Sequence, residues 1–368
     1  MSLALEKVGL RIGAEMHLDA IDLSLPAGSV TVLLGPTLAG KTSLLRVMAG
    51  LDRPTEGRVL VDGRDVTGVG VRRRNVAMVY QQFVNYPSLS VYENIASPLR
   101  MARKLEAAEI DRRVRATAQI MRIDSLLDRL PSELSGGQQQ RTAIARALIK
   151  GADLLLLDEP LVNLDYKLRE ELREEMREIF SHRAVTVVYA TTEPSEALML
   201  GGNTAVLDAG HLIQFGGTIE VYRHPASLRV GEIFSDPPMN LMPADLTGGQ
   251  ARLSADVAFA TPGHMRGLGD GHYRIGVRAN HIFLDSAVGG EPSAALAIPA
   301  TVELSEISGS ETFVHARHNG LTLVVQREGV HSYELGQPVM LYIDPKRLYV
   351  FDGAGTLAAS PIRTAEAP

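Results

Sequence analysis

The chain has 368 residues, 45% of them hydrophobic, a length and composition that suit two folded domains better than one or three. Its formal net charge of -6 argues against a nucleic-acid binder that relies on a broad basic face. It contains no cysteine, which excludes disulfides and thiolate metal sites.

The first ten residues predict a strand, because apolar residues alternate there with Glu6 and Lys7. The segment lacks the uninterrupted apolar core of a signal peptide, so we expect no export. The longest apolar runs, such as Val30 to Leu34 and Leu154 to Leu157, fall far below the roughly 20 residues that a membrane helix needs. Any membrane role is therefore expected to come through a partner.

A glycine-rich loop lies between a predicted strand over Val30 to Leu34 and a predicted helix over Ser43 to Ala49. This is the context of a P-loop, which predicts ATP and Mg²⁺ as ligands. Backbone N–H groups can cradle the phosphates, Lys41 adds a positive charge, and the Thr42 hydroxyl can ligate Mg²⁺. The alternative is a glycine turn that contains Gly-Lys-Thr by chance. The expected ATP-binding residues are Gly35, Pro36, Thr37, Leu38, Ala39, Gly40, Lys41, Thr42 and Ser43.

A second glycine motif begins at Ser135 and precedes a helical stretch through Leu148. A serine and two glycines at a helix N-terminus can form an anion site with exposed N–H donors and little side-chain bulk. A lone Ser-Gly-Gly is more often a flexible turn. The residues of this candidate site are Ser135, Gly136, Gly137 and Gln138.

Two carboxylates, Asp158 and Glu159, follow the apolar run Leu154 to Leu157, which predicts a strand buried on both faces. Ligands of open α/β sheets bind at the carboxyl ends of the strands. Asp158 can therefore hold Mg²⁺ through water, and Glu159 can orient or deprotonate an attacking water. An isolated Asp-Glu pair would more often face solvent, and Lys41 elsewhere in the chain favours the phosphate site.

The pattern of elements predicts two domains. Residues 1–235 alternate short strands with amphipathic helices, as in an α/β domain. Two prolines near residue 237 stop the helical pattern, and residues 236–352 predict a small β-barrel with a hairpin at Asn319-Gly320. Residues 353–368 predict a mobile tail. One predicted helix spans 165–180, with an apolar face of Leu168, Leu172, Met176 and Phe180.

The segment Leu134 to Arg141, which contains Ser-Gly-Gly-Gln, resembles the signature sequence of ABC ATPases. In that family the signature of one subunit faces the ATP held by the P-loop of another, so the resemblance implies a dimer. It also implies that Gln81 reaches Mg²⁺ and the attacking water, and that residues 87–150 form a helical subdomain contacting a permease. Leu164-Asp165 matches the end of the family's D-loop.

The chain from Ile275 to Asp352 resembles the oligonucleotide-binding-type (MOP/TOBE-like) regulatory barrels of maltose-type importers. The P-loop together with Tyr189 to Pro194 resembles one of the paired ATPase subunits of bacterial glycerol importers. These resemblances imply an ATPase that energises import of a carbohydrate or a polyol such as glycerol. They also imply a second ATPase subunit, two permeases, a periplasmic solute-binding protein, no nucleic acid, and a place at the cytoplasmic face of the inner membrane.

The chain departs from the family at Thr192, which occupies the position of the switch histidine. A threonine hydroxyl is short and neutral, so hydrolysis at this chain's own site is expected to be weak. Two interpretations stay open: a hydrolysing subunit in a heterodimer, favoured by Glu159, and a nucleotide-binding scaffold that completes a partner's site, favoured by Thr192. The expected catalytic residues are Glu159, Gln81 and Thr192, and the expected Mg²⁺ ligands are Thr42, Gln81 and Asp158.

Overall fold

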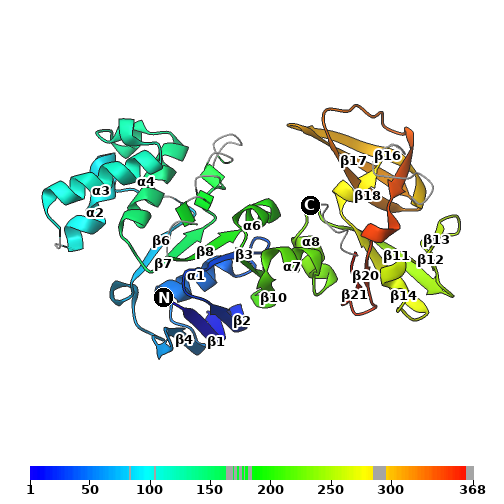
Figure 1. Cartoon of the computed structure of the whole chain (residues 1–368), viewed down its shortest axis with the longest axis horizontal. Helices are drawn as coiled ribbons and strands as arrows, with labels where there is room; N and C mark the ends of the chain where they lie inside the picture. The colour runs from blue at the N-terminus through cyan, green and yellow to red at the C-terminus, as the bar shows by residue number, and fades with distance from the viewer. Residues whose placement is uncertain are drawn as a thin grey trace. The chain divides into compact units, whose positions relative to one another are not determined.

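The structure is a computed structural model that describes residues 1–82, 84–102, 105–162, 169, 172–173, 176–177, 179–180, 185–284 and 296–361. The chain divides into two compact units, Met1–Thr218 and Ile219–Pro368, which are described separately below (Figure 1). The predicted D-loop residues Leu164 and Asp165 lie outside the described residues. Within the described ranges, no helix is long and apolar enough to cross a membrane.

A six-stranded sheet forms the centre of the first unit, in the order β10-β9-β3-β8-β7-β6. All neighbouring pairs are parallel except β9 and β10. Because β8 lies between β3 and β7 and is built of apolar and β-branched residues, it is buried along its whole length. The strands are β3 (Val30–Leu34), β6 (Val76–Val79), β7 (Leu154–Asp158), β8 (Thr186–Thr191), β9 (Asn203–Asp208) and β10 (His211–Gly217).

Helix α1 (Lys41–Ala49) packs between this sheet and a four-stranded sheet of order β2-β1-β4-β5 (Figure 1). Leu44, Leu45 and Met48 of the helix are fully buried in one hydrophobic cluster with residues of both sheets. The helix ends at Gly50, whose left-handed φ of 75° suits a glycine C-cap. The strands of the second sheet are β1 (Leu3–Ile12), β2 (Glu15–Leu25), β4 (Glu56–Val61) and β5 (Arg64–Asp65).

Three further helices, α2 (Val91–Ala102), α3 (Ala107–Ile120) and α4 (Gly136–Ile149), pack against one another as a separate group of the same unit (Figure 1). The buried Arg141 of α4 donates a hydrogen bond of 3.0 Å to the carbonyl of Met121 after α3, which fastens the two helices. A short helix α6 (Pro194–Leu200) follows β8. In the predicted helix 165–180, the described residues Leu172, Met176 and Phe180 are buried, and Leu168 lies outside the described residues.

The second unit contains a six-stranded sheet, β13-β12-β11-β14-β20-β21, and a five-stranded sheet, β15-β19-β16-β17-β18. Apolar residues from both sheets form one core, so the prediction of a β-rich second domain is confirmed. The predicted hairpin joins β17 and β18, and Asn319 and Gly320 have the positive φ values, 45° and 82°, of a tight turn. The helices and strands from Thr218 onward are α7 (Thr218–Arg223), α8 (Leu228–Ile233), β11 (Asn240–Thr247), β12 (Gln250–Arg252), β13 (Ala258–Ala260), β14 (Gly271–Val277), β15 (Ile282–Phe283), β16 (Leu296–Ser308), β17 (Glu311–His318), β18 (Leu321–Glu328), β19 (Pro338–Ile343), β20 (Tyr349–Phe351) and β21 (Leu357–Ala359).

The segment predicted as a mobile tail begins with ordered structure. Strand β21 pairs with β20, and the intervening turn is held by Asp352, whose carboxylate accepts the N–H groups of Ala354 and Thr356 at 2.9 Å. An aspartate that bonds the backbone two residues on stabilises such a turn, a local effect that the composition of the segment conceals. Residues 362–368 of the predicted tail lie outside the described residues.

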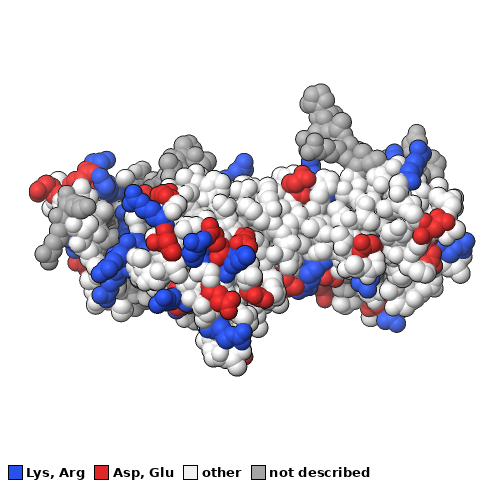
Figure 2. All heavy atoms as spheres, turned by 90° about the horizontal axis from the view of Figure 1, so that it is seen from below, with Lys and Arg blue, Asp and Glu red and all other residues white. Residues whose placement is uncertain are grey.

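Charged side chains are intermixed on the face drawn in Figure 2. Lys and Arg side chains stand beside Asp and Glu side chains over both units. Among the described residues of that face, no extended area carries basic side chains alone, in keeping with a net charge of -6.

Candidate functional site

Four segments predicted to act together follow neighbouring strands at one edge of the central sheet. The P-loop follows β3, Thr192 follows β8, Glu159 follows β7, and Gln81 follows β6. These strands are adjacent in the order β3-β8-β7-β6, and all four are parallel. Their carboxyl ends therefore meet at one edge, where open α/β sheets bind ligands.

Backbone hydrogen bonds attach both phosphate-site loops to the end of β8. The N–H of Gly35 donates to the carbonyl of Thr191 at 3.4 Å, and the N–H of Glu159 donates to the carbonyl of Ala190 at 3.0 Å. Glu159 adopts a positive φ of 44°, which is uncommon for a residue other than glycine and turns the chain sharply at the end of β7. The P-loop and Glu159 are thus positioned by the same strand.

The side chain of Lys41 lies at the centre of the P-loop and is 4% exposed. Its Nζ donates to the carbonyls of Gly35 and Pro36 at 2.7 and 2.9 Å and lies 3.2 Å from Oε1 of Glu159. Burial lowers the pKa of Lys41, while the neighbouring Glu159 carboxylate acts in the opposite direction. A phosphate that enters the loop would therefore compete with Glu159 for the ammonium group.

Oxygen ligands suited to Mg²⁺ lie beside the lysine. Thr42 Oγ1 donates to Oδ1 of Asp158 at 3.1 Å, and Nε2 of Gln81 donates to Oε2 of Glu159 at 3.2 Å. Burial raises the pKa of Asp158, so a bound cation would favour its charged form. Among the described residues no group of three or more His, Asp or Glu could hold a metal alone. A hydroxyl with one carboxylate fits Mg²⁺ that completes its shell with phosphate oxygens and water.

Leu38 occupies a strained position in the P-loop. Its φ is 68°, in the left-handed region, and its side chain is 94% exposed. Gly40 also has a positive φ, 97°, and a Cβ there would lie 2.8 Å from the carbonyl oxygen of His17, so glycine is required at that position. The left-handed φ of Leu38 is itself unfavourable, because this conformation costs roughly 1–2 kcal/mol for any residue that has a Cβ.

Replacing Leu38 with glycine is expected to raise the free energy of unfolding by about 0.5–1 kcal/mol. Relief of roughly 1–2 kcal/mol of backbone strain exceeds the extra chain entropy of glycine, about 0.5–1 kcal/mol. Thermal unfolding of the full chain measures the change. The control is Ala39→Gly at the neighbouring buried residue, which relieves no positive φ and should destabilise the protein. A loss of stability in Leu38→Gly would contradict the assigned strain.

Thr192 is exposed, between buried Thr191 and half-buried Glu193. The Oγ1 of Thr191 accepts the N–H of Glu193 at 3.0 Å, which closes a tight turn around the intervening residue. The structure thus places Thr192 at the sheet edge that carries the P-loop and Glu159. Its hydroxyl is the only polar group of that side chain, and the exposed position leaves room for a larger one.

The second glycine motif lies at the N-terminus of α4. Ser135 caps the helix: its Oγ accepts the N–H of Gln138 at 3.4 Å, and its own N–H donates to Gln138 Oε1 at 3.0 Å. Ser135 and Gly136 are exposed, and Gly137 is buried. Within the described part of the chain, no hydrogen bond or ion pair joins these residues to the P-loop. The two sites, both of them among the described residues, therefore share no direct hydrogen bond.

The segment after Gln81 is hydrogen-bonded to helix α4, which carries the second glycine motif at its start. The sequence analysis did not predict this contact. Asn85 Nδ2 donates to the carbonyl of Gln139 in α4 at 2.8 Å. Arg146 of the same helix donates to the carbonyl of Val84 and stacks over the ring of Tyr86 at 4.8 Å. An arginine in the largely apolar second half of α4 was the available signal, because a long basic side chain there needs partners. The helical group is thereby tied to the chain that carries Gln81.

Two protein families match this chain. The family described as ABC transporter matches residues 18–162, which include the P-loop, the motif at Ser135 and the carboxylates. The family described as TOBE domain matches residues 275–351 of the second unit.

Relatives of known name match nearly the whole chain, and a solved structure matches part of it. An sn-glycerol-3-phosphate import ATP-binding protein from Chromohalobacter salexigens is 37% identical over 92% of this chain and 90% of its own length. The protein of the same name from Salmonella typhimurium is 35% identical over 93% and 94%. The dimeric structure of the ATP-binding cassette MJ0796 bound to ADP and Pi superposes with a TM-score of 0.54 at 28% identity, over 59% of this chain and 98% of that one.

Proposed function

The chain belongs to the family of ATP-binding subunits of ABC transporters, and from this premise we propose that it energises the import of sn-glycerol-3-phosphate or a similar polyol phosphate. As a member of this family it is an ATPase. The solute rests on the names of relatives that are 35–37% identical over more than nine-tenths of the chain. The sequence resemblance led us to expect a polyol such as glycerol, and sn-glycerol-3-phosphate is the phosphate ester of glycerol.

The observation that carries the proposed chemistry is the convergence of Lys41, Thr42, Asp158 and Glu159 at one sheet edge. We assign Lys41 and the P-loop N–H groups to the β- and γ-phosphates, and Thr42 with Asp158 to Mg²⁺. Mg²⁺, when bound there, would neutralise part of the negative charge of the phosphates. Glu159 is assigned to orient or deprotonate the water that attacks the γ-phosphate in line, with Gln81 beside it.

The signature residues Ser135–Gln138 are assigned to the ATP of a second ATPase subunit. The exposure of Ser135 and Gly136 at a capped helix N-terminus and the lack of a hydrogen bond from these described residues to the chain's own P-loop support this assignment. Solved relatives of the fold are described as dimeric. Because Thr192 weakens only this chain's site, a heterodimer with a complete companion is favoured over a homodimer.

The rest of the assembly follows from the importer assignment. We place the subunit at the cytoplasmic face of the membrane through two permeases, with a periplasmic solute-binding protein on the other side. Residues 1–235 serve as the ATPase domain, with a helical subdomain over 87–150, and residues 236–352 as a regulatory barrel of the oligonucleotide-binding type. A nucleotide-binding scaffold is the second candidate, and Thr192 is the observation in its favour.

The solute is tested with the assembled transporter in vesicles, supplied with its solute-binding protein. Loading that protein with sn-glycerol-3-phosphate is expected to raise the rate of ATP hydrolysis about 10-fold, because closure of the ATPases is coupled to solute delivery. Glycerol and maltose are the controls and should leave the basal rate unchanged. Stimulation by glycerol or maltose in place of the phosphate ester would overturn the assigned solute.

A further inference from the structure

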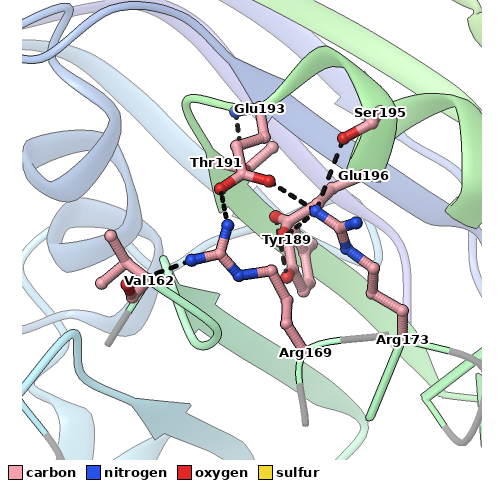
Figure 3. A network of polar contacts seen from close by, with 8 residues as sticks. All are labelled: Val162, Arg169, Arg173, Tyr189, Thr191, Glu193, Ser195 and Glu196. Carbon is pink, nitrogen blue, oxygen red and sulfur yellow. Dashed lines mark hydrogen bonds and ion pairs between the residues drawn. The ribbon is translucent and has the colours of Figure 1, made fainter. Parts of the chain in front are cut away.

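Two arginines hold the carboxylate of Glu193 in the turn between β8 and α6 (Figure 3). Arg169 Nη1 lies 2.5 Å from Oε1 of Glu193, and Arg173 Nη2 binds the other oxygen. Arg173 also lies 3.5 Å from Oε1 of Glu196, whose Oε2 accepts the hydroxyl of Tyr189 in β8 at 3.0 Å. The turn is thus fixed to a buried strand on one side and to two cations on the other.

The two arginines that contact Glu193 are largely shielded from water. The side chains of Arg169 and Arg173 are 22% and 10% exposed, and that of Glu193 is 30% exposed. An exposed cluster in the same unit offers a comparison, because Glu109 of α3 also binds two arginines, which are 71% and 47% exposed. Charge-assisted hydrogen bonds are stronger in the less exposed cluster, since solvent screens exposed pairs.

Arg169 joins two loops of the phosphate site. Its Nη2 donates to the carbonyl of Val162 at 3.4 Å, while its Nη1 binds Glu193 (Figure 3). Val162 lies three residues after Glu159, and Glu193 directly follows Thr192. One planar guanidinium therefore connects the loop after β7 with the turn after β8.

We propose that Glu193 is a positioning residue, which through Arg169 holds Thr192 at a fixed place relative to Glu159. The inference rests on the proposed function, because it assigns Thr192 and Glu159 to the same ATP. Glu193 contacts neither the nucleotide nor the attacking water, and it acts through the turn that carries Thr192. Losing the bridge lets the two loops move independently, and small misplacements of reacting groups slow catalysis strongly.

Kinetics of the assembled transporter with the companion ATP site inactivated test the proposal. Glu193→Gln is expected to lower kcat about 10-fold and to leave the KM for ATP within about two-fold. In a Thr192→Ala background the same change should have no further effect, because the residue that Glu193 positions is gone. Glu6→Gln, which removes an exposed ion pair with Arg58 outside the helical subdomain, should leave kcat unchanged. Equal losses of kcat in both backgrounds would overturn the proposal.

A second variant keeps the charge but removes the bridge. Arg169 binds Glu193 and the Val162 carbonyl with two separate nitrogen atoms, whereas a lysine carries all its donors on one nitrogen, so Arg169→Lys should reproduce the loss of kcat. Full activity in a folded Arg169→Lys protein would contradict the bridging role.

Hydrogen exchange of the full chain supplies a readout that needs no turnover. In Glu193→Gln, the amides of Leu161 and Val162 and those of 190–193 should both exchange faster, whereas Glu109→Gln should change neither. Faster exchange of 190–193 alone would show that the loops are not coupled and would overturn the proposal. The proposal that Glu159 acts in ATP hydrolysis at this site is tested separately, because it would be wrong if Glu159→Gln left the hydrolysis rate unchanged.

Discussion

Glu159→Gln is expected to lower ATP hydrolysis at this chain's site by about 100-fold or more while ATP binding is retained. A general base contributes on the order of 10²–10⁴-fold, and a glutamine amide cannot take a proton from water. Glutamine also removes the carboxylate that lies 3.2 Å from Lys41, so the ammonium becomes available to phosphate. Nucleotide affinity should therefore stay the same or rise.

The measurement compares ATPase rates of vesicles that contain Glu159→Gln here or the equivalent change in the companion ATPase. Asp153→Asn is the matched control, because it makes the same acid-to-amide change just before the opposite end of β7. Loss of turnover with Glu159→Gln identifies a full catalytic subunit. If only the companion's variant stops hydrolysis, this site binds without hydrolysing and the scaffold interpretation replaces the catalytic one.

Thr192→His is expected to raise the hydrolysis rate of the same site by roughly 10-fold or more. Losing one donor to the transition state costs about 10²–10³-fold in enzymes that depend on it, and an imidazole N–H reaches further than a threonine hydroxyl. Thr192 is exposed, so the larger side chain meets no packing barrier. Single-turnover kinetics with the companion site inactivated isolate the effect.

Thr192→Val is the counterpart, because valine keeps the shape of threonine and removes its hydroxyl. A lower rate in the valine variant would show that the hydroxyl already assists hydrolysis. A rate in Thr192→His no higher than that of the parent would mean that residue 192 does not face the γ-phosphate, and the assigned weakness of the site would need another cause.

The phosphate site was predictable because each of its parts is contiguous in the sequence. The strand, loop and helix around Lys41 adjoin one another, and the buried run before Asp158 identifies its own carboxyl end. Parallel strands then place such ends along one sheet edge, so local patterns were sufficient to bring these residues together. The α/β class of the first domain followed from short apolar runs that alternate with amphipathic helices, and the β class of the second domain followed from strands in which apolar and polar residues alternate.

The contacts between segments were not predictable in this way. Arg169 and Glu193 are 24 residues apart, and Asn85 and Gln139 are 54 residues apart. Their pairing depends on how the helices pack, and a charged residue on a predicted helix is by default assigned to solvent. The i, i+4 spacing of Arg169 and Arg173 placed them on one helix face, but nothing local identified the carboxylate between them.

The fully buried strand β8 sets the spacing of the whole phosphate site, since Gly35 and Glu159 both bond to its last residues. Inserting or deleting one residue within it would move those attachment points by about 3.3 Å and turn every side chain to the opposite face. The protein should therefore tolerate added residues in surface turns such as Asn319-Gly320 far better than in β8. In a scan of single-residue insertions along the chain, no insertion within this six-residue strand should give an active protein.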